Sequence, residues 1–344
     1  MLLLVVVSIT GCNFVKKESK TATLLSTTDA TQAQLMEEVN RFARVDSMRA
    51  KMDLKFEDNS FAQFGSKEVY RSADGEVVVQ RPGQIILNVK VPVLKTDVAQ
   101  MTSNGETFRV AILYDGGGKY KKFVKGTNNA DYSKLQSSLT ELNGDGTVRQ
   151  NVSAFANLRP QHFTDAMLVR PTDDQHVYAS STTFQIEEDL TADKKSPLRK
   201  VNRGYYLLDE YSKADSSDLK ITRRFWFDRV GGIRLARQQI FDARGEIETD
   251  IVYGAEGNLG DTGQFNRLPL QILVTRPQEK YAMRLTYQMP EDVKIGNKYP
   301  DTAFVLQNSW GLEEVDLDKK LQESTASKPP GSAVSNQNSA TRFH

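Results

Sequence analysis

Cys12 is the side chain with the most distinctive chemical setting in this sequence. It is the only cysteine among 344 residues, and it ends the apolar run MLLLVVVSITGC. A run of about ten apolar residues is too short to cross a bilayer core, which takes about 20. Small residues directly before a cysteine suit a peptidase with a narrow site. We therefore expect residues 1–11 to be a cleavable targeting signal and not a structural helix.

Ile9-Thr10-Gly11-Cys12 resembles the lipobox of bacterial lipoprotein signal peptides, in which an aliphatic and two small residues precede the lipidated cysteine. No Lys or Arg precedes Leu2, which departs from the charged start of such signals. The resemblance implies a mature protein that begins at Cys12 with a thioether-linked diacylglycerol and usually an N-acyl chain. Each buried CH₂ contributes about 0.8 kcal/mol, and two or more chains anchor stably. A chance Gly-Cys is the alternative, which the position, the lone cysteine and the polar stretch that follows disfavour.

The other residues that could do chemistry lack the spacing for it. The histidines His162, His176 and His344 are far apart and form no HxxxH or HExxH motif, so we expect no metal site. The acidic pairs Asp173-Asp174 and Glu187-Glu188 lie in polar stretches, where solvated charges are a better interpretation than acid–base catalysis.

Glycine-rich and nucleophile motifs are equally uninformative. Gly116-Gly117-Gly118 precedes an expected strand and opens no GxxxxGK[ST] motif, so it predicts a hairpin turn. Asn143-Gly144-Asp145-Gly146 lacks the other ligands of an EF-hand loop, and no nucleophile elbow is present. The sequence predicts neither an enzyme nor a cofactor.

Charge and composition restrict the possible partners. The 45 Lys and Arg against 44 Asp and Glu leave a net charge of +1, without the basic excess of nucleic-acid-binding proteins. A lone cysteine used for lipidation leaves none for a disulfide, so stability must come from the core. We expect a monomer attached to a membrane through Cys12 and no nucleic-acid partner.

The chain begins with a tether and one amphipathic helix. Residues 12–28 are rich in Ser, Thr and Lys, which predicts a flexible lipidated tether. Leu35, Val39 and Phe42 then fall at i, i+4 and i+7, and Asp29 and Gln32 have the spacing of a capping box. The pattern predicts a helix over about 35–45 that covers an apolar surface.

Most of the remaining chain alternates apolar and polar residues with period two, the pattern of half-buried strands. A second helix is expected after Pro160, a short one at most within 126–150, and a disordered tail over 319–344. The expected strands are 48–57, 68–80, 84–91, 98–101, 108–114, 119–124, one from about 176, 204–211, 219–228, 233–241, 247–253, 268–275 and 281–289. Short turns such as Asn104-Gly105 join successive strands, which favours one curved antiparallel sheet with helices on its concave face.

This order of elements resembles the LolA/LolB-like superfamily of periplasmic lipoprotein carriers and receptors, also described as outer-membrane lipoprotein-sorting-like. The resemblance covers residues 30–310 and is carried by the segments GEVVVQRPGQIILNV, NGETFRVAILYDGGGKYKKF, NLRPQHFTDAML and RRFWFDRVGGIRLARQQIFDARGEIETDIVYG with LPLQILVTRP. It implies a mainly β (α+β) half-barrel over residues 29–318, with two or more helices closing a cavity for acyl chains. The family's soluble carrier is not lipidated, so Cys12 favours an anchored receptor.

From this resemblance we expect a lipid or a lipoprotein acyl chain as ligand, and an outer-membrane location facing the periplasm. The alternative is a structural or assembly lipoprotein with a filled core and protein partners. Apolar stripes of the strands and the first helix nominate residues that line the cavity, or pack the core under the alternative: Phe42, Phe225, Phe227, Met283 and Leu285.

Overall fold

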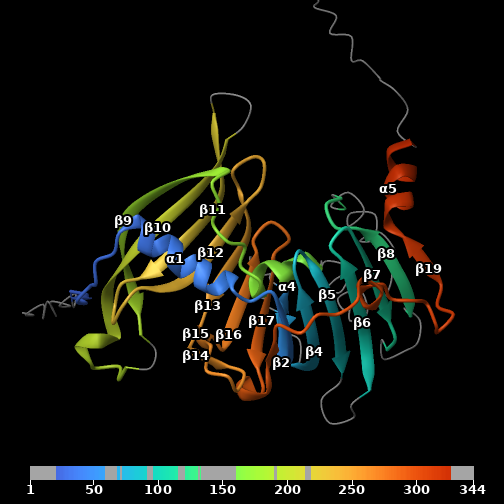
Figure 1. Ribbon diagram of the computed structural model, residues 1–344, viewed down its shortest axis with the longest axis horizontal. Coiled ribbons are helices and arrows are strands. Elements are labelled where there is room, and N and C mark those ends of the chain that lie inside the picture. The colour runs from blue at the N-terminus through green and yellow to red at the C-terminus, as the bar shows by residue number, and fades with distance from the viewer. Residues whose placement is uncertain are drawn as a thin grey trace, which may run out of the picture.

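The computed structural model describes residues 21–58, 68–69, 72–90, 96–114, 121–130, 132, 160–189, 192–213 and 218–326. The chain is mainly β, and one large sheet, not closed into a barrel, contains most of its strands. Figure 1 shows this sheet as two wings that meet at β2 (Ser47–Asp58). The predicted mainly β half-barrel is confirmed as an open, curved sheet.

The β10 wing contains the later strands of the chain. Its members, in spatial order from the free edge, are β9 (His176–Glu188), β10 (Lys200–Lys213), β11 (Leu219–Asp228), β12 (Arg234–Phe241), β13 (Ile247–Tyr253), β16 (Gln271–Arg276) and β17 (Tyr281–Tyr287). β17 pairs with β2. A separate two-stranded sheet, β14 (Glu256–Leu259) and β15 (Phe265–Pro269), interrupts the chain between β13 and β16.

The β5 wing continues from the other side of β2. In spatial order its strands are β4 (Ala73–Gln80), β5 (Gln84–Lys90), β6 (Asp97–Asn104), β7 (Thr107–Ile112), β8 (Lys122–Thr127) and β19 (Glu314–Asp316). The short strands β3 (Glu68–Val69) and β18 (Lys294–Ile295) also pair with β2. β4 and β5 meet at the turn Arg81-Pro82-Gly83, and β6 and β7 at the predicted turn Asn104-Gly105.

Two pairings depart from the predicted all-antiparallel sheet. β1 (Thr23–Leu24) pairs in parallel with β10, and β19 pairs in parallel with β8. Both strands reach the sheet through long connections and not through hairpins, which is the condition for parallel pairing. Thr28 also donates its backbone N–H to the carbonyl of Arg229 at 2.8 Å. Residues 23–28, which we predicted to be part of a flexible tether, are therefore bound to the sheet.

Alternation along each strand gives the sheet one apolar inner face. In β2, Met48, Met52 and Leu54 are buried, whereas Arg49 and Lys51 between them are exposed. Residues paired across neighbouring strands share a face, so the buried side of β2 is continuous with the buried side of the strands paired with it. The buried residues form one continuous apolar cluster that runs through both wings.

α1 (Gln32–Ala43) lies across the inner face of the β10 wing (Figure 1). Leu35, Val39 and Phe42 are its buried residues, as the periodicity predicted. The predicted capping box is displaced by two residues, because Thr31 caps the helix together with Gln34. Asp29 instead forms an ion pair with Arg229 at 2.6 Å, which draws the preceding chain against β11.

α4 (Pro160–Met167) covers the inner face where the wings meet, with Phe163, Ala166 and Met167 buried (Figure 1). Single-turn helices also occur: η2 (Pro197–Arg199), η3 (Pro290–Asp292) and η4 (Asp301–Phe304). α5 (Leu317–Ala326) corrects the start of the predicted disordered tail. The start of the helix is held at the sheet edge, because β19 pairs with β8, Leu317 is buried and Asp318 accepts a hydrogen bond from Oγ1 of Thr127 at 2.9 Å.

Candidate functional site

The inner face of the β10 wing changes character along β10. Alternate β10 residues point to this face, and their register partners on β9 and β11 point the same way. Three zones follow: an open end at Asn202 and Gly204, a middle at Tyr206 and Leu208, and a polar end at Glu210. α1 covers the middle zone.

The middle zone contains three of the five side chains that we predicted to line a cavity. Phe225 and Phe227 of β11 pair with Leu208 and Tyr206, and both lack any solvent-accessible surface. The ring of Phe42 from α1, 5% exposed, packs on Tyr253 with 5.4 Å between ring centroids. The structure thus brings the Phe residues of β11 under the helix that carries Phe42.

Met283 and Leu285 lie elsewhere on the same inner face. They are in β17, paired with Phe56 and Leu54 of β2, and also have no accessible surface. Four strand spacings separate β17 from β11, or about 19 Å at about 4.8 Å per strand. These two residues therefore belong to the junction of the wings and not to the zone under α1. That the five residues line one cavity stays a prediction.

Two buried polar atoms on the inner-face side chains of β12 and β13 were not predicted from the sequence. Among the described residues, the hydroxyl of Tyr253 and Oε1 of Gln238 have no hydrogen-bond partner, although both side chains are nearly inaccessible. Burial raises the pKa of Tyr253, so its hydroxyl stays protonated and available as a donor. A buried unpaired polar atom costs about 1–3 kcal/mol, which a polar group of a bound molecule could offset. Their strand positions resemble ordinary core positions, so no local sequence pattern marks them.

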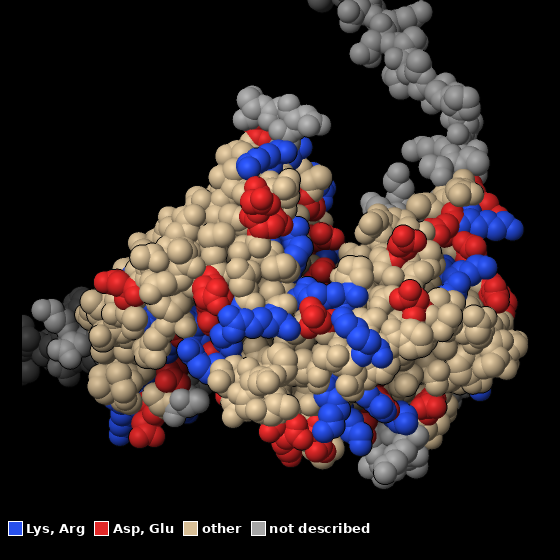
Figure 2. Space-filling view, in the orientation of Figure 1, with Lys and Arg blue, Asp and Glu red and all other residues tan. Residues whose placement is uncertain are grey.

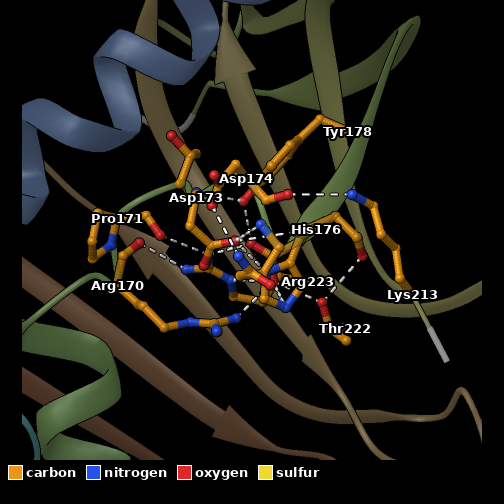
Figure 3. A network of polar contacts seen from close by, with 12 residues as sticks. Arg170, Pro171, Asp173, Asp174, His176, Tyr178, Lys213, Thr222 and Arg223 are labelled. Atoms are coloured by element: carbon orange, nitrogen blue, oxygen red, sulfur yellow. Dashed lines mark hydrogen bonds and ion pairs between the residues drawn. The ribbon is translucent and has the colours of Figure 1, made fainter. Parts of the chain in front are cut away.

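A buried charge network closes the polar end (Figure 3). Glu210, with no accessible surface, accepts hydrogen bonds from both Nε and Nη2 of Arg223, the first at 2.8 Å. It also accepts from Nη2 of Arg170 and Oγ1 of Thr222, both at 2.7 Å, and from the hydroxyl of Tyr178 at 3.0 Å. Burial alone would raise the pKa of Glu210, but the hydrogen bond and charge of Arg223 outweigh it and hold the pKa below its usual range.

His176 extends this network toward the surface. Its Nδ1 lies 2.6 Å from Oδ1 of Asp173, and its Nε2 lies 3.9 Å from Glu210. Asp173 also accepts the backbone N–H of Gln175 at 3.0 Å. Burial acts to raise the pKa of Asp173, yet the bond to His176 and these turn contacts lower it. Of the pair that we predicted to be solvated, Asp174 is exposed and Asp173 is held in the turn.

The composition of this network indicates a structural role in closing one end of the sheet. Carboxylates are matched by arginines, and Arg223 also donates to the carbonyls of Arg170 and Pro171 at 2.8 and 3.2 Å, which ties residues 170–171 over the end of the sheet (Figure 3). Within the described ranges, no group of three or more His, Cys, Asp or Glu side chains is arranged to hold a metal ion. His162, one of the predicted isolated histidines, is buried with Nδ1 2.5 Å from the hydroxyl of Tyr281.

The remaining predicted features are surface carboxylates or lie outside the described residues. Glu187 and Glu188 pair with Arg203 at 3.4 Å and Arg199 at 2.9 Å, so they are ion-paired at the surface of β9 and β10. Cys12, His344 and the segments 115–120 and 133–159 lie outside the described residues. Within the described part of the chain, no helix has the length and apolar character needed to span a membrane.

Comparison with known proteins gives structural likeness only. No family model matches the sequence, and no curated protein matches it. A LolA superfamily protein from Nitrosomonas europaea is similar over 80% of this chain and 99% of its own, at 13% identity and a TM-score of 0.41. A DUF1329 family protein from Desulfovibrio piger is similar over 81% and 98%, at 10% identity and a TM-score of 0.40.

A third solved structure, an outer membrane lipoprotein-sorting protein domain from Vibrio parahaemolyticus, covers 78% of this chain with 95% of its own. Its identity is 10% and its TM-score 0.38. All three TM-scores lie below 0.5, so these similarities carry no conclusion about family, ligand or partner.

Proposed function

We propose that this chain is a lipid-anchored cell-envelope protein that binds a lipid or lipoprotein acyl chain on the inner face of the β10 wing, beneath α1. The observation that supports it best is the cover of the middle zone, where a single helix of 12 residues shields Phe225 and Phe227 of an open sheet. Residues 1–11 act as the signal, Cys12 carries the lipid, and the folded body extends from Thr23.

The contacts of α1 suit a cover that can be displaced. Its side chains make a few polar contacts with the rest of the body. Gln32 donates to the carbonyl of Tyr178 at 3.3 Å, and Glu38 accepts the backbone N–H of Leu235 at 3.4 Å. Asn40 and Thr172 bond each other at 2.9 Å, and Arg41 donates to the carbonyls of residues 266 and 267 at 2.8 and 3.1 Å. Three of its side chains are buried. Burial of three such side chains contributes about 5–9 kcal/mol, at about 1.5–3 each.

An acyl chain can offset this cost. At about 0.8 kcal/mol per buried CH₂, about twelve methylene groups contribute about 10 kcal/mol. A common membrane acyl chain therefore replaces the apolar contacts of Leu35, Val39 and Phe42 without a net loss of burial. The buried hydroxyl of Tyr253 then has a partner in a carbonyl or carboxylate of the ligand.

The test compares the acyl affinity and the stability of two leucine truncations in the Cys12→Ser chain. Leu35→Ala weakens the cover, so it should lower the free energy of unfolding by about 2–5 kcal/mol and tighten the binding of a fluorescent fatty acid. Leu87→Ala removes an equally buried leucine of β5, in the other wing. It should lower stability similarly and leave the affinity unchanged. Equal effects of the two variants on affinity would contradict a site beneath α1.

A structural or assembly lipoprotein with a filled core is the second candidate. It is favoured by the complete burial of Phe225, Phe227, Met283 and Leu285 in one continuous cluster. Absence of any acyl binding by the folded wild-type chain, checked by circular dichroism, would favour this candidate over the first.

A further inference from the structure

Three large apolar side chains are exposed at the open end of the inner face. Leu24 is 65% exposed, Ile186 64% and Phe184 49%. Leu24 pairs with Asn202 of β10, and Asn202 pairs with Ile186 of β9 on its other side. Because paired residues share a face, Leu24 and Ile186 point to the inner side of the sheet. We call these three side chains the open-end patch.

Phe184 completes the patch two residues from Ile186, opposite Gly204. A Cβ at position 204 would lie 3.0 Å from Cε1 of Phe184 and 2.7 Å from Cγ2 of Thr27. The absence of a side chain there lets the phenyl ring lie down on the sheet, in line with Leu24 and Ile186.

The cover of the middle zone stops short of this patch. The chain leading into α1 crosses the inner face at Tyr206, whose hydroxyl accepts the backbone N–H of Ala30 at 3.3 Å. The patch lies on the far side of this crossing from α1. The apolar inner face therefore emerges from beneath its cover at this end, and the charge network closes it at the other.

The start of the described chain places the patch near the site of the predicted lipid anchor. Leu24 itself belongs to β1, and only ten residues lie between Cys12 and Thr23. At about 3.3–3.6 Å per residue, that segment spans at most about 40 Å. A bilayer that holds lipids attached to Cys12 is thus always within reach of the patch.

The charges around the patch suit an anionic lipid surface. Residues 177–186 of β9 contain no charged side chain, and Figure 2 shows the flank of the molecule over β9 and β10 as largely uncharged. Beside it, Lys194, Lys195 and Lys200 are exposed, with Asp193 and Glu188 as exposed acidic neighbours. Glu187 and Glu188 are matched by arginines. Apolar side chains rimmed by lysines are the composition of a surface that lies at the interface of a membrane.

We propose that the open-end patch is a membrane-docking surface. Leu24, Phe184 and Ile186 enter the headgroup–acyl boundary, the three lysines lie among anionic headgroups, and the uncovered end of the inner face is turned toward lipid. The inference rests on the anchor part of the proposed function and does not require an acyl-binding site beneath α1.

The experiment measures which part of the anchored protein contacts lipid. Ile186→Cys and, as control, Leu219→Cys are made in the full chain, labelled with an environment-sensitive fluorophore and reconstituted in phosphatidylethanolamine–phosphatidylglycerol vesicles. Leu219 is matched in exposure, at 55%, but pairs with Lys213 at the other end of β10. Twelve residues along the strand separate that end from Val201, or about 40 Å.

The label at position 186 should shift its emission to shorter wavelength and be quenched by brominated acyl chains, whereas the label at 219 should do neither. Lys194→Glu with Lys195→Glu should reduce the shift at 186 in these vesicles and not in purely zwitterionic ones. An unshifted label at 186, or equal shifts at both positions, overturns the proposal. A shift at 186 that appears without vesicles and grows with protein concentration overturns it in favour of a second copy as the occupant.

Failure of the anchor is recognised separately. The wild-type chain takes up no thiol label if Cys12 carries lipid, so labelling of wild type contradicts the anchor. In that case the same two labels are measured in the Cys12→Ser chain added to vesicles. A label at 186 that stays in water there, whether or not the chain binds, overturns the docking surface.

Discussion

Asp165 of α4 has an ionisation state that depends on its packing against the polar end of the inner face. Burial raises the pKa of its carboxyl to about 6, the charge of Glu248 acts in the same direction, and Arg276 and Arg223 act against it. The residue as a whole is only half-buried. Between about pH 4 and pH 6 the carboxyl of Asp165 is therefore protonated in the folded state and largely ionised in the unfolded chain.

Stability should consequently fall as the pH rises from about 4 to about 6, where the folded state holds more protons than the unfolded state. Asp165→Asn imitates the neutral form and should raise the free energy of unfolding at pH 8 by about 1–2 kcal/mol, after allowance for partial exposure. At pH 3.5 it should change little, because both states are then protonated. Urea unfolding at the two pH values measures this, and an equal effect at both contradicts the assignment.

Glu210 is the buried acceptor at the centre of the charge network. Glu210→Gln leaves the guanidinium of Arg223 buried without its countercharge, so it should lower the free energy of unfolding by about 3–5 kcal/mol. Glu188→Gln removes an exposed carboxylate whose partner is Arg199 and should cost less than about 1 kcal/mol. Chemical denaturation of both variants gives the comparison. Similar costs would show that the network is solvated in solution.

Residue by residue, the sequence predicted burial better than it predicted polar contacts. The burial of Phe42, Phe225 and Leu285 follows from periodicity within one element, which a sequence contains. The partnership of Glu210 with Arg223 depends on the register of the β10–β11 hairpin, which shifts at a bulge between Glu210 and Tyr211. Nothing local to DEYSK marks that shift, so Glu210 had the pattern of an ordinary polar strand end.

α1 illustrates the same limit for a whole element. Its apolar stripe was predicted correctly, whereas its cap was assigned to Asp29 in place of Thr31. Both residues are good N-caps, and the choice was made by Arg229 of the β11–β12 turn, which pairs with Asp29. A contact between segments 200 residues apart in sequence is not visible to a local capping rule.

The capping assignment can be tested by a matched pair of substitutions. Thr31→Ala removes the side-chain acceptor for the N–H of Gln34 and should lower the free energy of unfolding by about 1 kcal/mol, whereas Thr31→Gly should cost only a few tenths. Thermal unfolding followed by circular dichroism resolves the difference. If Asp29→Ala lowered stability through the helix and Thr31→Ala did not, the predicted cap and not the observed one would be operative.

At the scale of the molecule, one open sheet was predictable because most strands follow their neighbours through short turns. The parallel strands β1 and β19 were not, since strands of two and three residues have no period to detect. They matter for the shape all the same, because each ties one end of the described chain to the sheet. β1 in particular fixes where the N-terminal segment leaves the body, at the open end of the β10 wing.

The proposed attachment to the membrane involves both the N-terminal anchor and the folded body. If the acyl chains on Cys12 supply stable anchoring, Cys12→Ser should move the protein from the membrane pellet to the supernatant after a high-salt wash. Salt is needed because the open-end patch and its lysines should still give a weak, screened attraction to anionic lipid. Adding Ile186→Ser should then release the protein at low salt as well. Position 12 lies outside the described body and the Ile186 side chain is 64% exposed, so both variants should keep the circular dichroism spectrum of the wild type. Retention of the Cys12→Ser protein in the washed pellet would mean that something other than the lipid holds it there.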